Sequence, residues 1–280
     1  MLKKTLVIQG GGFRTSFTAG VLDAFQSHDY NPFDSYVAVS GGAIALSYYL
    51  GDQYKKCYEA MCLLAVDKNF MSWNRMISSK GIMNVDYFNH VANKEVLFNL
   101  EKAIKSVHEK ELAFVLTNKL TGEPHYYHPS KKTWLDGVIA SCTLPFVTKG
   151  KHCLHGEEYF DGGWSDPLPV EWAAKNGASD ILVIRTTPAN LKMNQSWPDY
   201  FGSFIHRSNK KLQACFENNH EKFNASIDFM NDPPEGINLV QIAPDGPLQT
   251  GTYSNSVKLI SADYRNGLDC GLNYLHSLNS

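Results

Sequence analysis

The sequence has no long apolar run and no excess of charge of one sign. A helix that crosses a bilayer needs roughly 20 consecutive apolar residues, and no segment of the 280 residues approaches that length. We therefore expect any membrane contact to be peripheral. Lys and Arg number 26 and Asp and Glu 28, which gives a formal net charge of −2. Because this balance offers no electrostatic reason to bind nucleic acid, we expect no nucleic-acid partner.

Metal-binding and disulfide patterns are also missing. The cysteines form no C-x-x-C pair, the spacing typical of zinc and redox sites, so we expect reduced thiols. Two histidine pairs, His125 with His128 and His152 with His155, are not completed by an acidic or thiol pattern, and we interpret them as surface or hairpin residues. We expect no metal and no cofactor. The six cysteines are Cys57, Cys62, Cys142, Cys153, Cys215 and Cys270.

The N-terminus lacks the apolar core of a signal peptide. Only Thr5–Ile8 form an apolar run before Gln9, and this run is too short for such a core. The expected location is the cytoplasm, or the inner membrane surface as a peripheral protein.

The chain does contain a repeated strand–turn–helix pattern near its start. With 43% hydrophobic and 19% charged residues it should fold as an ordinary globular protein. Residues 6–8 and 36–39 are strand-like, and each run leads through a glycine turn, Gly10–Gly12 or Ser40–Gly42, into a helical pattern. This alternation predicts a parallel sheet flanked by helices, with both turns at the carboxyl ends of neighbouring strands and facing each other.

Residues 1–280 are expected to form a single domain with a helical cap at 52–110 and a C-terminal extension at 200–280. An apolar cluster in the cap either joins the core, the commoner role, or forms an acyl-chain groove or a lip that touches a membrane. It comprises Phe70, Met71, Trp73, Met76 and Ile77. Further strands are predicted at 112–117, 124–128, 181–184 and 237–242, and further helices at 134–141, 169–176, 201–230 and 259–275, the 201–230 segment being amphipathic.

The first glycine turn, Gly10–Gly12, has the character of an anion hole. No side chain blocks an anion from its backbone N–H groups, and the following helix adds the positive end of its dipole. The alternative is a turn that only lets helix and sheet pack closely. Two nucleotide patterns fail, because the dinucleotide motif would need glycine at Thr15 and no Gly-Lys-Ser/Thr sequence completes a phosphate loop.

Ser40 is a candidate nucleophile. It lies between a strand-like run and a helix among small residues, as a sharp elbow requires, although Ala38 replaces the first glycine of G-x-S-x-G. The alternative is a helix N-cap. Asp161, which begins the Asp161–Gly163 segment, is a better candidate for the general base than a histidine. The alternative is that Asp161 is only an acidic turn residue. A triad with His276 is less favoured because Ser40 follows only the second strand, earlier than in α/β-hydrolases.

Taken together, these motifs and their order resemble the patatin-like phospholipase family, in its bacterial branch, over most of residues 5–187. Two departures from the family pattern, Thr15 and Ala38, each put a side chain where glycine is common and could narrow the site. The matching segments are Gly10–Arg14, Val39–Ala43, Ala140–Pro145, Asp161–Val170 and Gly177–Ile184.

The resemblance implies a three-layer α/β/α sandwich with a mainly parallel sheet. It also implies a Ser40–Asp161 dyad that hydrolyses lipid acyl esters, as a phospholipase A or lysophospholipase does, without histidine or metal. The N–H groups of Gly10, Gly11 and Gly12 would hold the oxyanion. Arg14 would either buttress that loop or meet a lipid phosphate, and Gly42 and Gly163 would support the two turns.

Two other functions compete with this hypothesis. The altered positions Ala38 and Thr15 would suit a catalytically weak lipid-binding or regulatory module on the same fold. A nucleotide-dependent enzyme that uses the glycine turn as a phosphate cradle is the more distant alternative, because both nucleotide motifs fail. Asp166 and Asp34 are given structural roles only, in a turn and in a loop.

Overall fold

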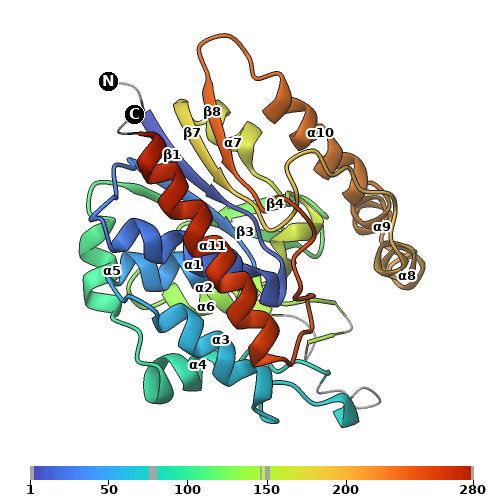
Figure 1. The fold of residues 1–280 in the computed structure, drawn as a ribbon. Coiled ribbons are helices and arrows are strands. Elements are labelled where there is room, and N and C mark those ends of the chain that lie inside the picture. Colours follow the sequence, from blue (N-terminus) through green and yellow to red (C-terminus); the bar gives the residue numbers. More distant parts are fainter. Residues whose placement is uncertain (1–2, 76–80, 146, 149–151, 279–280) are drawn as a thin grey trace.

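A sheet of eight strands runs through the middle of the molecule (Figure 1). The computed structural model describes residues 3–75, 81–145, 147–148 and 152–278. Within them the strand order is β5-β6-β3-β2-β1-β7-β8, and β4 also pairs with β3. The strands are β1 (Lys3–Ile8), β2 (Ser35–Val39), β3 (Glu111–Asn118), β4 (Pro124–Tyr127), β5 (His152–Leu154), β6 (Glu157–Asp161), β7 (Ala178–Ile184) and β8 (Asn238–Ile242).

Strands β3, β2, β1, β7 and β8 are parallel, and β4, β5 and β6 form an antiparallel edge. The buried positions of the central strands are mostly apolar because helices cover both faces of the sheet. The predicted neighbours β1 and β2 do pair, with Ile8 opposite Ala38 in register. The predicted hairpin of β3 and β4 is present, and β5 is a short strand that the sequence pattern did not indicate.

Helices cover both faces of the sheet, which confirms the α/β/α fold class. Side chains such as Leu6 and Ile8 face α1, α2, α6 and α11, whereas Val7 and Val37 face α7 and α10. The helices are α1 (Thr15–Gln26), α2 (Gly41–Leu50), α3 (Lys56–Val66), α4 (Tyr87–His90), α5 (Leu100–Ser106), α6 (Trp134–Ser141), α7 (Val170–Lys175), α8 (Trp197–Ile205), α9 (Lys210–Glu217), α10 (Asn219–Asn231) and α11 (Val257–Ser277). Short 3₁₀ or π turns occur at Gly12–Arg14, Trp73–Arg75, Val91–Glu95 and Gly162–Trp164.

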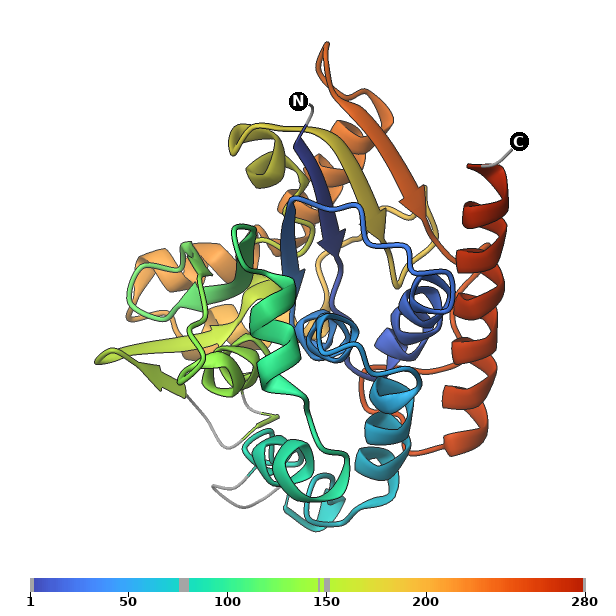
Figure 2. The same cartoon turned by 90° about the vertical axis from the view of Figure 1, so that its left-hand side faces the viewer.

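The segment expected to be a cap adds α3, α4 and α5 outside the layer of α1 and α2, and Figure 2 shows α3 and α4 at the lower end of the molecule. Phe70 and Met71 are buried in the same core as the sheet, but Trp73 is half exposed. Met76 and Ile77, the other members of the apolar cluster, lie outside the described residues.

The C-terminal segment is built into the sheet and its helical layer. Strand β8 continues the parallel sheet beside β7, and α11 lies along α1 (Figure 1). The two helices approach so closely that a Cβ on Gly267 would lie 1.9 Å from the carbonyl oxygen of Phe17. Tyr264 on α11 also donates a hydrogen bond of 2.7 Å to Asp23 on α1.

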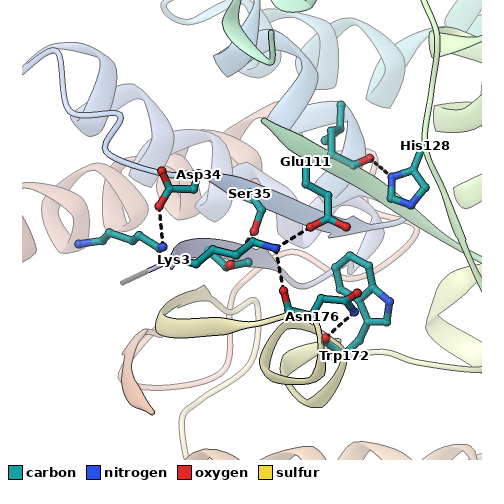
Figure 3. Close-up of polar contacts among 10 residues, drawn as sticks. Lys3, Asp34, Ser35, Glu111, His128, Trp172 and Asn176 are labelled. Carbon is teal, nitrogen blue, oxygen red and sulfur yellow. Dashed lines mark hydrogen bonds and ion pairs between the residues drawn. The ribbon is translucent and has the colours of Figure 1, made fainter. Parts of the chain in front are cut away.

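Polar contacts tie together the end of the sheet where β1 begins (Figure 3). The Lys3 ammonium group donates to the Glu111 carboxylate at 2.7 Å and to the Asn176 carbonyl oxygen at 2.8 Å. The backbone N–H of Lys4 donates to Asp34 at 2.8 Å. These bonds hold the parallel register at the end of the sheet opposite to the one where Ser40 follows β2.

Candidate active site

Ser40 occupies a strained elbow between β2 and α2. Its φ of 55° and ψ of −131° lie in a region that costs a non-glycine residue about 1–3 kcal/mol. The glycines beside it are required by close packing, because a Cβ on Gly41 would lie 2.6 Å from Thr15 Oγ1 and one on Gly42 2.8 Å from Ile8 Cγ2. Ser40 precedes α2 but its side chain makes no capping hydrogen bond. The N-cap alternative is therefore wrong for the hydroxyl group.

Ser141, to which the sequence analysis assigned no role, supports the elbow. Its buried hydroxyl accepts a hydrogen bond of 2.8 Å from the Ser40 backbone N–H and donates one of 2.8 Å to the Val115 carbonyl oxygen. It thereby connects α6 to both β2 and β3. The segment Ala140–Pro145 matched the family pattern, and this was the only sequence signal for it.

Asp161 ends β6 and is only 3% exposed, so it is not a solvated turn residue. Burial raises its pKa to about 6, against hydrogen bonds from the Ser40 hydroxyl and the Gly163 N–H that lower it. The Gly163 bond measures 2.8 Å. Gly162 passes so close to β3 that a Cβ would lie 2.1 Å from the Val115 carbonyl oxygen. The turn thus places a desolvated carboxylate against the Ser40 hydroxyl.

Two side chains that the sequence analysis missed hold this turn. Asn219 at the start of α10 donates to the carbonyl oxygens of Gly163 and Trp164, at 2.6 and 3.0 Å. Thr117 on β3 donates to the Asp161 carbonyl oxygen at 2.8 Å. Asp166 joins the turn through its backbone N–H, which donates to the Gly162 carbonyl oxygen, as its expected structural role requires.

The glycine turn faces Ser40, as the sequence pattern predicted. A Cβ on Gly10 would lie 2.8 Å from the Ser40 Cβ. The Thr186 hydroxyl donates to the Gly10 carbonyl oxygen at 2.5 Å. Because a trans peptide is planar with its C=O and N–H opposed, the Gly11 N–H points away from Thr186. Within the described residues the N–H groups of Gly10 and Gly11 have no acceptor.

Gly12 completes the turn and is enclosed by a distant part of the chain. Its φ is +58°, and a Cβ there would lie 2.4 Å from the Thr252 carbonyl oxygen. The hydroxyl of Thr15 donates to the Gly12 carbonyl oxygen. Thr15 therefore fastens the turn, and it also lines a cavity beside Ser40, whereas Ala38 faces the core and lines neither cavity at the site. Of the two side chains expected to narrow the site, only that of Thr15 therefore lies beside Ser40.

Arg14 extends along the glycine turn into the site. Its Nε is 3.1 Å from the position that a Cβ on Gly11 would take, and burial lowers the pKa of its guanidinium group. This Nε is buried without a hydrogen-bond partner among the described residues. Arg14 packs against the turn, as buttressing requires, and also lines a cleft that contains Ser40 and Asp161, where an anionic group would reach it.

Two cavities that differ in polarity meet at Ser40 and Gly12. The first contains about 570 Å³ of space, its mouth included, and is apolar. The second contains about 940 Å³, also with its mouth, and is lined by both polar and apolar residues. The apolar cavity includes Phe13, Ile44, Met61, Leu64, Phe70, Met83, Val85 and Phe88. The polar cleft includes Arg14, Asp161, Ser196, Asp199, Asn219 and Tyr253.

Two other candidate groups, the Cys142 thiol and the His276 imidazole, do not serve as nucleophile or base at Ser40. Cys142 touches Ser40, but burial raises the pKa of its thiol well above the usual value, which keeps it protonated. His276 is exposed near the end of α11 and lines neither cavity. No histidine lines either cavity among the described residues. The same residues hold no cluster of three or more His, Cys, Asp or Glu arranged for a metal ion.

The model of the patatin-like phospholipases matches residues 6–174, more than half of the chain. The chain belongs to this family. A family model described as a domain of unknown function, DUF6363, matches residues 209–280. Among curated proteins, the uncharacterized protein YjjU of Escherichia coli (strain K12) is 28% identical over 272 residues, covering 96% of this chain and 76% of YjjU.

A solved structure shares the fold. The crystal structure of VipD from Legionella pneumophila aligns with a TM-score of 0.51 at 14% identity, over 99% of this chain and 67% of VipD. Membership of the patatin-like phospholipases places this chain in a family of lipid hydrolases. Among its described helices, none combines the length and apolarity that crossing a membrane would take.

Proposed function

We propose that this protein is a serine acyl hydrolase that cleaves acyl esters of lipids through a Ser40–Asp161 dyad. The observation that carries the proposal is Ser40 on its strained elbow beside the buried Asp161 carboxylate, at the junction of an apolar cavity and a more polar one. A lipid ester has the same division, with an apolar acyl chain on one side of the reacting carbonyl and a polar alcohol on the other.

The reaction follows from the positions of these groups. Asp161 takes the proton of the Ser40 hydroxyl while the oxygen attacks the ester carbonyl carbon. The N–H groups of the Gly10–Gly12 turn stabilise the oxyanion, a contribution worth about 10²–10³ in turnover for one donor. Asp161 then gives the proton to the leaving alcohol. Water, deprotonated by Asp161, attacks the acyl-enzyme carbonyl carbon, and the fatty acid leaves as Asp161 returns that proton to the Ser40 oxygen.

The cavities also bear on the kind of substrate. The apolar cavity accepts the acyl chain between Phe70, Met61 and Leu64. The polar cleft accepts the alcohol portion beside Arg14, whose unpaired Nε suits an anionic headgroup. Esters that place one acyl chain beside Ser40, as in phospholipase A and lysophospholipase reactions, fit this arrangement.

A fluorophosphonate probe tests the proposal directly, because it reacts with an activated serine. We expect labelling at Ser40, mapped by mass spectrometry, that is lost in Ser40→Ala and strongly reduced in Asp161→Asn. The matched control is Asp23→Asn, another buried aspartate whose pKa is raised to about 6 but which lines neither cavity. Folded protein without labelling would favour the catalytically weak lipid-binding module.

A further inference from the structure

Helix α8 presents its apolar side to solvent. Apolar residues recur at spacings of three and four, the period of one helix face. The inward side carries Asp199, Gly202 and Ser203, which are buried. This is the reverse of the usual arrangement in a globular protein. The outward side, which we name the α8 face, comprises Trp197 (83% exposed), Tyr200 (57%), Phe201 (47%), Phe204 (63%) and Ile205 (43%).

The inward side is held in place by specific contacts, so the helix is not free to turn its apolar side inward. A Cβ on Gly202 would lie 2.4 Å from the ring of Phe216 on α9. The Ser203 hydroxyl donates to Glu217 at 2.6 Å, and Asp199 accepts from the Ser196 N–H and hydroxyl, both at 2.6 Å. The buried polar groups are thus satisfied within the protein, and the apolar face is left outside.

Helix α8 begins at the cleft of the candidate active site. Ser196, Pro198 and Asp199, at the start of α8, line the polar cleft together with Ser40 and Asp161. In Figure 1 α8 lies at the outer edge of the molecule, beyond α9 and α10. Material that contacts this face therefore lies next to the cleft mouth.

Basic residues follow the aromatic ones. Arg207, Lys210 and Lys211 are exposed, and the Arg207 guanidinium lies 4.9 Å from the Phe204 ring centre. From residue 197 to residue 211 the only acidic residue is the buried Asp199. Trp and Tyr favour the headgroup level of a membrane, and Lys and Arg are attracted to anionic lipids.

We propose that the α8 face docks this protein on the surface of an anionic phospholipid bilayer, with the mouth of the Ser40 cleft against the lipid. The aromatic and aliphatic side chains enter the headgroup region, and Arg207, Lys210 and Lys211 contact lipid phosphates. The statement that docking delivers substrate to Ser40 rests on the proposed function. The binding itself does not, and it is measured separately.

Binding is tested by cosedimentation of full-length Ser40→Ala protein with vesicles of phosphatidylglycerol and phosphatidylethanolamine, and with neutral phosphatidylcholine vesicles. We expect binding to the anionic vesicles, weakened by salt, and at least about a tenfold loss of affinity when Trp197→Ser and Phe204→Ser are added. The matched control adds Val66→Ser and Leu97→Ser, each 62% exposed and outside α8, and retains binding. Equal affinity of both double variants would overturn the proposal.

A second readout separates this proposal from the proposed function. With Ser40 intact, the α8 double variant should lose hydrolysis of vesicle lipid and keep its rate on a short water-soluble ester. Fluorophosphonate labelling without α8-dependent vesicle binding overturns the docking surface alone. Vesicle binding without labelling supports the docking surface and overturns the hydrolase. Sedimentation velocity tests a further outcome. If the protein is a dimer that the two α8 substitutions dissociate, and no vesicle binding is seen, the α8 face binds a second copy of the chain and the bilayer proposal is overturned.

Discussion

At the scale of single residues, Asp161 determines how the proposed reaction depends on pH. Only the unprotonated carboxylate can accept the Ser40 proton, and burial raises its pKa to about 6. We expect kcat/KM on a soluble ester to rise with pH up to about 6 and to level off above it. An activity that stays constant between pH 4.5 and 7.5 would contradict Asp161 as the base.

Thr186 provides a second residue-scale prediction. Its hydroxyl fixes the Gly10 carbonyl oxygen, and its N–H is itself held by the Gln9 side chain at 2.9 Å. Thr186→Val removes the hydroxyl and lets the Gly10–Gly11 peptide turn, so we expect kcat to fall by about tenfold or more with little change in KM. Thr186→Ser should restore most of the rate. A valine variant with normal kcat would show that the peptide orientation does not depend on Thr186.

At the scale of elements, the contact between α1 and α11 depends on small residues. A Cβ on Gly267 would meet the Phe17 carbonyl oxygen at 1.9 Å, a distance that no Cβ tolerates. We expect Gly267→Ala to force the helices apart and lower the free energy of unfolding by about 2–4 kcal/mol. The measurement is urea unfolding followed by circular dichroism.

The control for this pair of helices is Gly246→Ala, where a Cβ meets nothing within 4 Å and φ is not positive. It should change stability by less than about 0.5 kcal/mol. If both variants unfold at the same urea concentration, the close approach of α1 and α11 is not needed for stability.

At the scale of the whole molecule, the segment that matches the uncharacterised family model is joined to the rest by the sheet and the core. It supplies β8 beside β7, Phe223 and Ile227 beneath the sheet, and α11 over α1. Thr252 in the same segment closes over Gly12 in the candidate site.

A chain that ends at residue 208 should therefore lose both its fold and its site. It would expose apolar surface on both faces of the sheet, and we expect no cooperative thermal unfolding and no fluorophosphonate labelling. Circular dichroism and the labelling assay check this against the full chain. A truncated chain that unfolds cooperatively and labels at Ser40 would show that residues 209–280 are dispensable for both the fold and the site.

The amino-acid sequence alone determined the fold class and the candidates Ser40, Asp161 and Gly10–Gly12. These are readable because each depends on a local pattern, an apolar strand followed by small residues in a tight turn. The turns of Gly10–Gly12 and Ser40 meet because β1 and β2 are parallel neighbours, whereas Asp161 reaches them from the antiparallel β6 on the far side of β3. The family pattern added Arg14 and the segment Ala140–Pro145.

Only the tertiary structure decided what surrounds these turns. Ser141, Asn219, Thr186 and Thr252 reach the site from distant parts of the chain, and no local pattern relates a side chain to a partner a hundred residues away. The direction of the α8 face was equally undetermined, because helical periodicity shows that one side is apolar but not whether it points inward. Gly202 and Ser203 decide it, because a side chain on Gly202 would clash with Phe216 on α9 and the Ser203 hydroxyl donates to Glu217, which leaves the aromatic residues outside.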